Sequence, residues 1–154
     1  MARHRFSVHV RASPEQVFAL WTDLDRAREW IEGLTKVDDI TGPVDRVGTR
    51  YVTWFGPMRS STEVIEADRP RVFATRFGIG GRTLLRGESR ATFEPDGDGT
   101  RLTQEFVTEG HVAAIFGRIF AMGSYRGSFR GELDTFVRLA EAEARARTDP
   151  DRRL

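Results

Sequence analysis

Three residues near the carboxyl end of the chain, Tyr125, Arg126 and His111, have types and spacing suited to acid-base chemistry on a small molecule. Tyr125 lies one helical turn before Phe129 on a predicted apolar stripe, and Arg126 borders that stripe. A phenol and a guanidinium beside a cavity can bind an enolate or a carboxylate. The alternative is that Arg126 is an ordinary surface arginine and His111 a solvated histidine at a helix start.

Other kinds of catalytic site lack their required residues. There is no cysteine, which excludes disulfides, thiolate catalysis and cysteine-based metal sites. His4 and His9 stand five positions apart on one predicted strand, so they point to opposite faces and cannot share a metal. The Gly78–Gly81 run lacks the lysine and the following helix of a phosphate loop, and no serine has the context of a nucleophile elbow. The sequence therefore predicts no metal and no cofactor.

The segment Gly110–Ala146 is predicted to be a long helix with two distinct halves. The second half has an apolar face of Phe129, Leu133, Phe136, Val137, Ala140 and Ala144, and a polar face of Arg130, Glu132, Arg138, Glu141 and Arg145. The first half is apolar from Val112 to Met122, includes Phe116, and is interrupted by glycines, which predicts a kinked cover over a cavity. A helix with one apolar stripe is unstable alone, so it must lie on a large apolar surface.

The elements upstream supply that surface. Residues 4–11 alternate between apolar and polar, which predicts a half-buried strand. Ser13, Pro14 and Gln16 then form a helix start with a capping box, and a second short helix is expected over residues 26–32, ending at Gly33. Six strands follow, at 36–41, 48–55, 58–67, 71–77, 82–93 and 100–109. Short turns between them predict an α+β domain whose curved antiparallel sheet of about seven strands wraps around the long last helix.

Several strand residues are predicted to face the space between the sheet and this helix. In strand 82–93, Leu85, Gly87, Ser89, Ala91 and Phe93 share the inward face, and the small ones favour a gap. Gln104 is expected inward beside Phe106, where it either binds a ligand oxygen or satisfies the backbone. The aromatic strand residues are assigned to no definite face. The predicted ligand-binding set is Tyr51, Trp54, Phe77, Leu85, Ser89, Gln104, Phe106, Phe116, Met122, Tyr125 and Phe129.

Composition limits the class of protein. The 154 residues, 39% hydrophobic and 31% charged, are typical of one globular domain, predicted over residues 1–146 with a disordered tail at 147–154. The formal charge is +1 and no basic block is interleaved with aromatics, which argues against nucleic-acid binding. No apolar run is long enough for a membrane span, and no signal peptide is evident, so we expect a cytoplasmic monomer or homodimer.

The order and spacing of these elements resemble the START-like (SRPBCC) superfamily, specifically its polyketide cyclase/dehydrase and lipid-transport branch. The resemblance covers residues 4–146. The segments that carry it are Ser13–Phe18 through Trp21, then Asp23 and Trp30, Val47–Arg50, Val64–Pro70, Asp98–Thr103 and Leu133–Glu141. It implies a helix-grip fold with a cavity between sheet and terminal helix, usually occupied by an apolar or aromatic small molecule.

Three functions follow as hypotheses. The first is binding or transport of a hydrophobic or aromatic small molecule in the cavity. The second is a polyketide cyclase or aromatase, in which Tyr125 and Arg126, with His111 or Gln104, act as acid or orienting groups. The third is a co-chaperone or protein-interaction domain, which predicts an exposed apolar patch along Val112–Met122.

Overall fold

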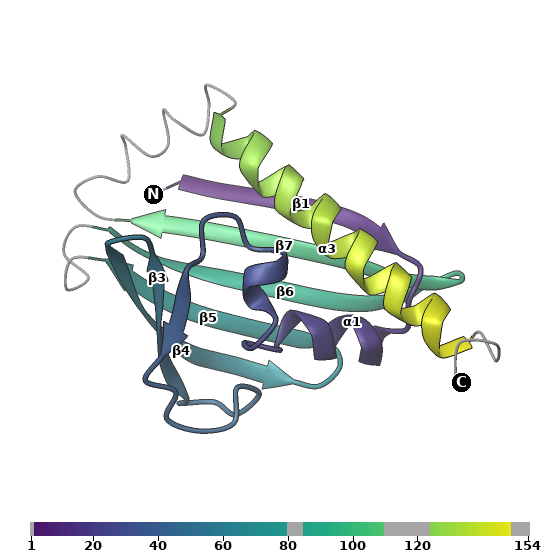
Figure 1. Ribbon diagram of the computed structural model, residues 1–154, viewed down its shortest axis with the longest axis horizontal. Helices are drawn as coiled ribbons and strands as arrows, with labels where there is room; N and C mark the ends of the chain where they lie inside the picture. Colours follow the sequence, from purple (N-terminus) through teal and green to yellow (C-terminus); the bar gives the residue numbers. More distant parts are fainter. Residues whose placement is uncertain (1, 80–84, 110–123, 149–154) are drawn as a thin grey trace.

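The protein is built on one seven-stranded antiparallel sheet with a long helix packed across it (Figure 1). The computed structural model describes residues 2–79, 85–109 and 124–148, except the side chains of residues 2 and 124–129. The strands are β1 (Ala2–Val10), β2 (Lys36–Asp38), β3 (Arg50–Phe55), β4 (Met58–Asp68), β5 (Val72–Ile79), β6 (Leu85–Asp96) and β7 (Gly99–Glu109). Their spatial order is β1-β7-β6-β5-β4-β3-β2, so only β1 lies out of sequence order, beside β7.

The strand alternation predicted for β6 is confirmed. Leu85, Gly87, Ala91 and Phe93 are buried, whereas Arg86, Glu88 and Arg90 are exposed. The register of β4 against β5 shifts between Val64 and Glu66, an irregularity of the kind that bends and twists a strand. β2 is shorter than predicted and ends at Asp38, because Asp39 has a φ of 54°, outside the extended region.

The helices are α1 (Pro14–Trp21), η1 (Ala27–Glu29) and α3 (Ser124–Thr148). The predicted capping box begins α1: Ser13 Oγ accepts from the Gln16 backbone N–H at 3.2 Å, and Gln16 Oε1 accepts from the Ser13 N–H at 3.0 Å. The second short helix is shorter than the sequence predicts. It is a single 3₁₀ turn, because Trp30 leaves helical geometry directly after it, with a φ of −132°. The chain then turns at Gly33, where φ is +79°.

The core forms where α1, η1 and α3 meet the sheet. Leu133, Phe136 and Ala140 of the predicted stripe are buried, and Phe136 is fully enclosed. Its ring meets those of Trp21 and Trp30 edge to face, with centroids 5.2 and 5.0 Å away. This aromatic cluster anchors α3 against the two short helices. The helix continues to Thr148, so residues 147 and 148 of the predicted tail are helical, whereas residues 149–154 lie outside the described part.

Candidate ligand-binding cavity

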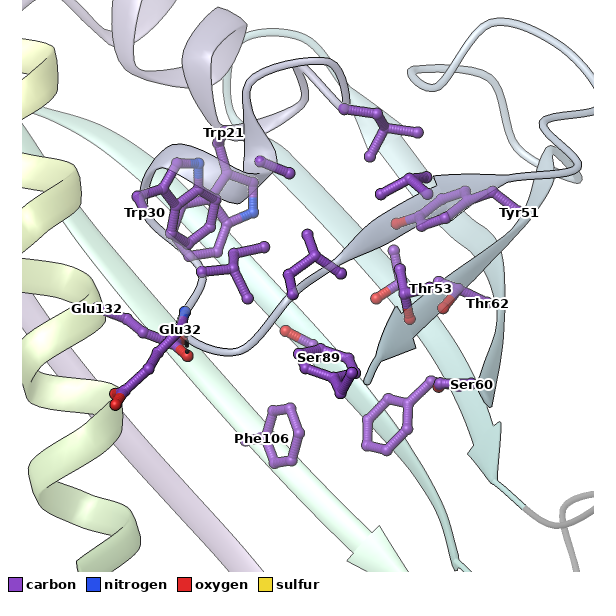
Figure 2. A pocket seen from close by; sticks show the side chains of 18 of the residues that line it. Trp21, Trp30, Glu32, Tyr51, Thr53, Ser60, Thr62, Ser89, Phe106 and Glu132 are labelled. Carbon is purple, nitrogen blue, oxygen red and sulfur yellow. Dashed lines mark hydrogen bonds between the residues drawn. The ribbon is translucent and has the colours of Figure 1, made fainter. Parts of the chain in front are cut away.

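A cavity of about 400 Å³ lies against the sheet, closed on one side by α3 and by the segment from Trp21 to Leu34 (Figure 2). Strands β3 to β7 each contribute inward side chains to its wall, because alternate residues of every strand face the same side. The apolar lining is Trp21, Leu24, Ala27, Trp30, Ile31, Leu34, Val37, Phe55, Met58, Phe73, Phe77, Ile79, Leu85 and Phe106. Phe77 and Phe106 stack with their centroids 5.1 Å apart and form part of the floor.

Uncharged polar groups are spread over the strands of this wall. They are Tyr51, Thr53, Ser60, Thr62, Thr75, Ser89, Gln104 and Thr108, with Thr22 from the end of α1. Gln104 Nε2 lies 3.4 Å from Ser89 Oγ, so the amide turns to a neighbouring side chain and not to the backbone. Burial raises the pKa of the Tyr51 phenol above its usual value, which keeps it a protonated hydrogen-bond donor. The sheet side of the cavity therefore offers hydroxyls and one amide, without a formal charge.

The Glu132 carboxyl is the feature of the cavity for which the sequence prediction is wrong. The helical pattern places Glu132 on the polar face of α3, but the residue is half-buried and lines the cavity. Its Oε1 accepts a hydrogen bond from the Glu32 backbone N–H at 3.1 Å. Burial, and secondarily the negative charge of Glu32, raises the Glu132 pKa to about 7. The sequence does contain a feature that could have predicted this inward position. Glu132 is one turn before Phe136 and adjacent to Leu133, so it lies at the edge of the apolar stripe.

Six of the predicted ligand contacts line the cavity: Tyr51, Phe77, Leu85, Ser89, Gln104 and Phe106. Trp54 does not, and its placement is a correction. It is an odd number of positions from Tyr51 on β3, so it faces the other side of the sheet, where its indole N–H donates to Asp38 Oδ1 at 3.3 Å.

The remaining predicted residues cannot be compared with the structure. His111, Phe116 and Met122 lie outside the described residues. Tyr125, Arg126 and Phe129 belong to α3, but their side chains are outside the described part. The predicted catalytic roles of Tyr125, Arg126 and His111 therefore stay predictions.

The cavity residues that the sequence does not reveal come mostly from elements other than the long strands. Trp21 and Trp30 have the spacing of core residues, yet each also lines the cavity, and their rings are 4.8 Å apart. Thr53, Ser60 and Thr62 have no distinguishing pattern, because β4 has serine or threonine on both faces and β3 has a single threonine. Their inward position depends on the parity of Tyr51, which the sequence leaves open.

Histidine and carboxylate groups elsewhere make ion pairs, and within the described residues no group of three or more has the arrangement of a metal site. His9 contacts Asp96 Oδ2 at 3.1 Å and Asp98 Oδ1 at 2.9 Å, and these hydrogen bonds raise its pKa. This contact ties β1 to the β6–β7 hairpin on the outer face. In the portion of the chain that is described, no helix has the length and apolar character needed to cross a membrane.

A curved antiparallel sheet, a long carboxyl-terminal helix and a cavity between them define the helix-grip class of START-like proteins. A family model described as "Polyketide cyclase / dehydrase and lipid transport" matches residues 1–141, and the chain belongs to this family. No curated protein matches the chain.

Solved structures share the fold at low sequence identity. The protein MLL2253 from Mesorhizobium loti superposes with a TM-score of 0.73 at 18% identity, covering 96% of this chain and 99% of that one. The protein CV1439 from Chromobacterium violaceum superposes with a TM-score of 0.69 at 16% identity, covering 90% of this chain and 96% of that one. DynU16, a putative protein in the dynemicin biosynthetic locus, superposes with a TM-score of 0.68 at 17% identity, covering 92% of this chain and 48% of that chain. These likenesses show the fold alone.

Proposed function

We propose that this protein binds an apolar or aromatic small molecule in the cavity beside α3. The observation that carries the proposal is a space of about 400 Å³ with aromatic and aliphatic walls and a few converging polar groups. Small-molecule sites in proteins typically enclose ~300–1,000 Å³ and have this composition. Membership of a family named for lipid transport and polyketide cyclisation supports the same class of ligand.

Two neighbouring serines on β4 provide a matched test. Ser60 is buried and lines the cavity, whereas Ser61 is exposed on the other face of the same strand. Ser60→Phe places a ring in the cavity, so it is expected to weaken binding of 2-naphthalenemethanol by about tenfold or more, equivalent to about 1.4 kcal/mol. Ser61→Phe should bind like the unmodified protein. Titration followed by the fluorescence of the wall tryptophans measures both.

Native mass spectrometry of the protein isolated from its own host tests the proposal without a chosen probe. A retained small molecule, absent from Ser60→Phe, is the expected result. The proposal fails if no molecule is retained and a panel of aromatic and aliphatic probes binds neither the unmodified protein nor Ser61→Phe.

A polyketide cyclase-type activity is the second candidate. It is favoured by the Glu132 carboxyl, whose pKa of about 7 suits proton exchange at neutral pH, and by the protonated phenol of Tyr51 in the same cavity. Under this hypothesis the protein changes the product distribution from a reactive poly-ketone chain. An unchanged distribution with the unmodified protein, and no further effect of Arg126→Ala or Glu132→Gln, would exclude it. The segment Val112–Met122, on which the protein-interaction hypothesis depends, lies outside the described residues.

A further inference from the structure

The charged groups of the cavity wall all have one sign. Among the described residues that line it, the charged ones are Glu32 and Glu132, and none is arginine, lysine or histidine. The whole chain has 24 lysine and arginine residues, and most acidic groups on the outer face of the sheet pair with one of them. The two cavity carboxyls differ in this respect from the paired acidic residues on the outer face of the sheet.

The Glu132 carboxyl has acceptor capacity to spare. A carboxylate can accept about four hydrogen bonds, and here the Glu32 backbone N–H supplies one. No basic side chain of the described residues forms an ion pair with Glu132. A half-buried carboxyl on the wall of a cavity, with one hydrogen-bond partner among the described residues, is poised to accept from a group that enters the cavity.

A second observation at the same side concerns the tryptophans. Trp21 and Trp30 lie on the side of the cavity where Glu32 and Glu132 approach, as Figure 2 shows. Trp30 is 8% exposed, and its indole N–H has no hydrogen-bond partner in the described structure. Indole rings attract cations to their faces, an effect that grows when the cation leaves water. Carboxyl groups and indoles together are the groups that recognise an organic cation.

The opposite side of the cavity has no such charge. Thr53, Ser60 and Thr62 come from β3 and β4, and Figure 2 places them away from the two glutamates. An elongated ligand therefore meets carboxyls and indoles at one end and apolar side chains with hydroxyls at the other. This asymmetry gives the ligand a direction.

We propose that the cavity selects an apolar or aromatic amine, bound as its ammonium ion with Glu132 as counter-ion and the Trp21–Trp30 pair beside it, and that it rejects carboxylates. The inference rests on the proposed ligand-binding function and specifies its substrate class. An ammonium N–H donates to the free carboxylate lone pairs, whereas a ligand carboxylate would be placed beside one or two like charges.

Binding of a cation is coupled to protonation of Glu132. Burial is the main cause of the raised pKa. The titratable group that acts on the carboxyl is Glu32, whose charge raises the pKa, whereas the hydrogen bond from its backbone N–H lowers it. An ammonium ion favours the ionised carboxyl, so its binding lowers the Glu132 pKa. Near pH 6 the free protein holds the proton and the complex does not. Amine binding is therefore expected to release a proton at this pH and to tighten as the pH rises to 8.

The test compares three probes of one shape on the full chain at pH 8: 2-naphthylmethylamine, 2-naphthalenemethanol and 2-naphthoate. The expected order of affinity is amine, alcohol, carboxylate. Glu132→Gln should weaken the amine by on the order of 10- to 100-fold, the range for a charge-assisted hydrogen bond, and weaken the alcohol far less. Asp134→Asn, a change of the same charge on an exposed neighbouring position of α3, is the control and should alter none of the three.

Proton release supplies a readout that a purely structural role of Glu132 would not change. Calorimetry of amine binding at pH 6, in two buffers of different ionisation enthalpy, should detect release with the unmodified protein and none with Glu132→Gln. The inference is overturned if naphthoate binds as tightly as the amine, or if Glu132→Gln leaves amine affinity unchanged while the alcohol still binds. If none of the three probes binds, the amine inference fails, and the retained-molecule and probe-panel tests decide separately whether the proposed binding function fails with it.

Discussion

Glu132→Gln is expected to stabilise the protein at pH 8 and to leave its stability nearly unchanged at pH 4.5. The amide that replaces the carboxyl keeps an oxygen able to accept the Glu32 N–H but has no proton to lose. The unmodified protein holds an ionised carboxyl at pH 8 in a position where burial opposes that charge more strongly than the Glu32 N–H hydrogen bond favours it.

The sign follows from proton binding in the two states. The pKa of Glu132 is about 7 in the folded protein against 4.5 in the unfolded chain. Between these values the folded state binds more protons, so its free energy of unfolding falls as the pH rises and levels off above pH 7. One pH unit corresponds to about 1.4 kcal/mol, so the shift from 4.5 to about 7 sets an upper limit of about 3.4 kcal/mol for the whole loss. Since part of the side chain contacts solvent in the cavity, we expect about 2 kcal/mol.

Urea unfolding at pH 4.5 and pH 8 measures the difference directly. In thermal melts at pH 8, a stabilisation of about 2 kcal/mol should raise the Tm of Glu132→Gln by roughly 4–8 °C in a chain of this size. Asp134→Asn controls for removing a negative charge from α3 and should show no such pH dependence. An equal effect of Glu132→Gln at the two pH values would refute the assignment of a buried, destabilising carboxylate.

Three further predictions concern the frame around the cavity. Phe136→Ala removes the ring at the centre of the aromatic cluster and should lower the free energy of unfolding by about 3–5 kcal/mol in urea melts, with a smaller loss for Phe136→Leu. The raised pKa of His9 adds stability that is present below pH 6.5 and lost as the pH rises through the raised value. The unmodified protein should therefore exceed His9→Gln in free energy of unfolding by more at pH 5.5 than at pH 8.5. An equal difference at the two pH values would argue against an ion pair of charged His9 with Asp96 and Asp98. Gly131→Ala should stabilise the protein by about 0.5–1 kcal/mol, because the new Cβ would meet open space on α3. Gly99→Ala should destabilise it, because the new Cβ would lie 2.0 Å from the Val10 carbonyl oxygen. Thermal melts should show a higher Tm for the first variant and a lower Tm for the second.

The elements that could be predicted are those governed by neighbours along the chain. The α1 cap depends on Ser13 and Gln16, three positions apart, and its hydrogen bonds form within that turn. The faces of β6 follow from strict alternation, since charged residues occupy every second position. The buried stripe of α3 follows from helical spacing, because Leu133, Phe136 and Ala140 recur on one side. Local geometry decides all three.

Predictions were wrong or left open where either face of an element could have turned toward the interior. Tyr51 and Trp54 are both large aromatic residues on β3, and either face could have been inward by composition. Pairing of β3 with β4 puts Tyr51 opposite Thr62 and turns both to the cavity, which leaves Trp54 to its contact with Asp38. The sequence of one strand contains no information on this choice, because it depends on which face the helices cover.

The candidate site shows the same division. Alternation predicted that Ser89, Gln104 and Phe106 face inward, and the family resemblance implied a helix-grip sheet with a cavity beside it. Only the tertiary structure decided that Glu132 joins them. A residue at the edge of a helical stripe faces solvent or the interior according to the tilt and rotation of the helix on its sheet. Packing of Phe136 against the two tryptophans sets that rotation in α3, and with it the placement of Glu132 in the wall of the cavity.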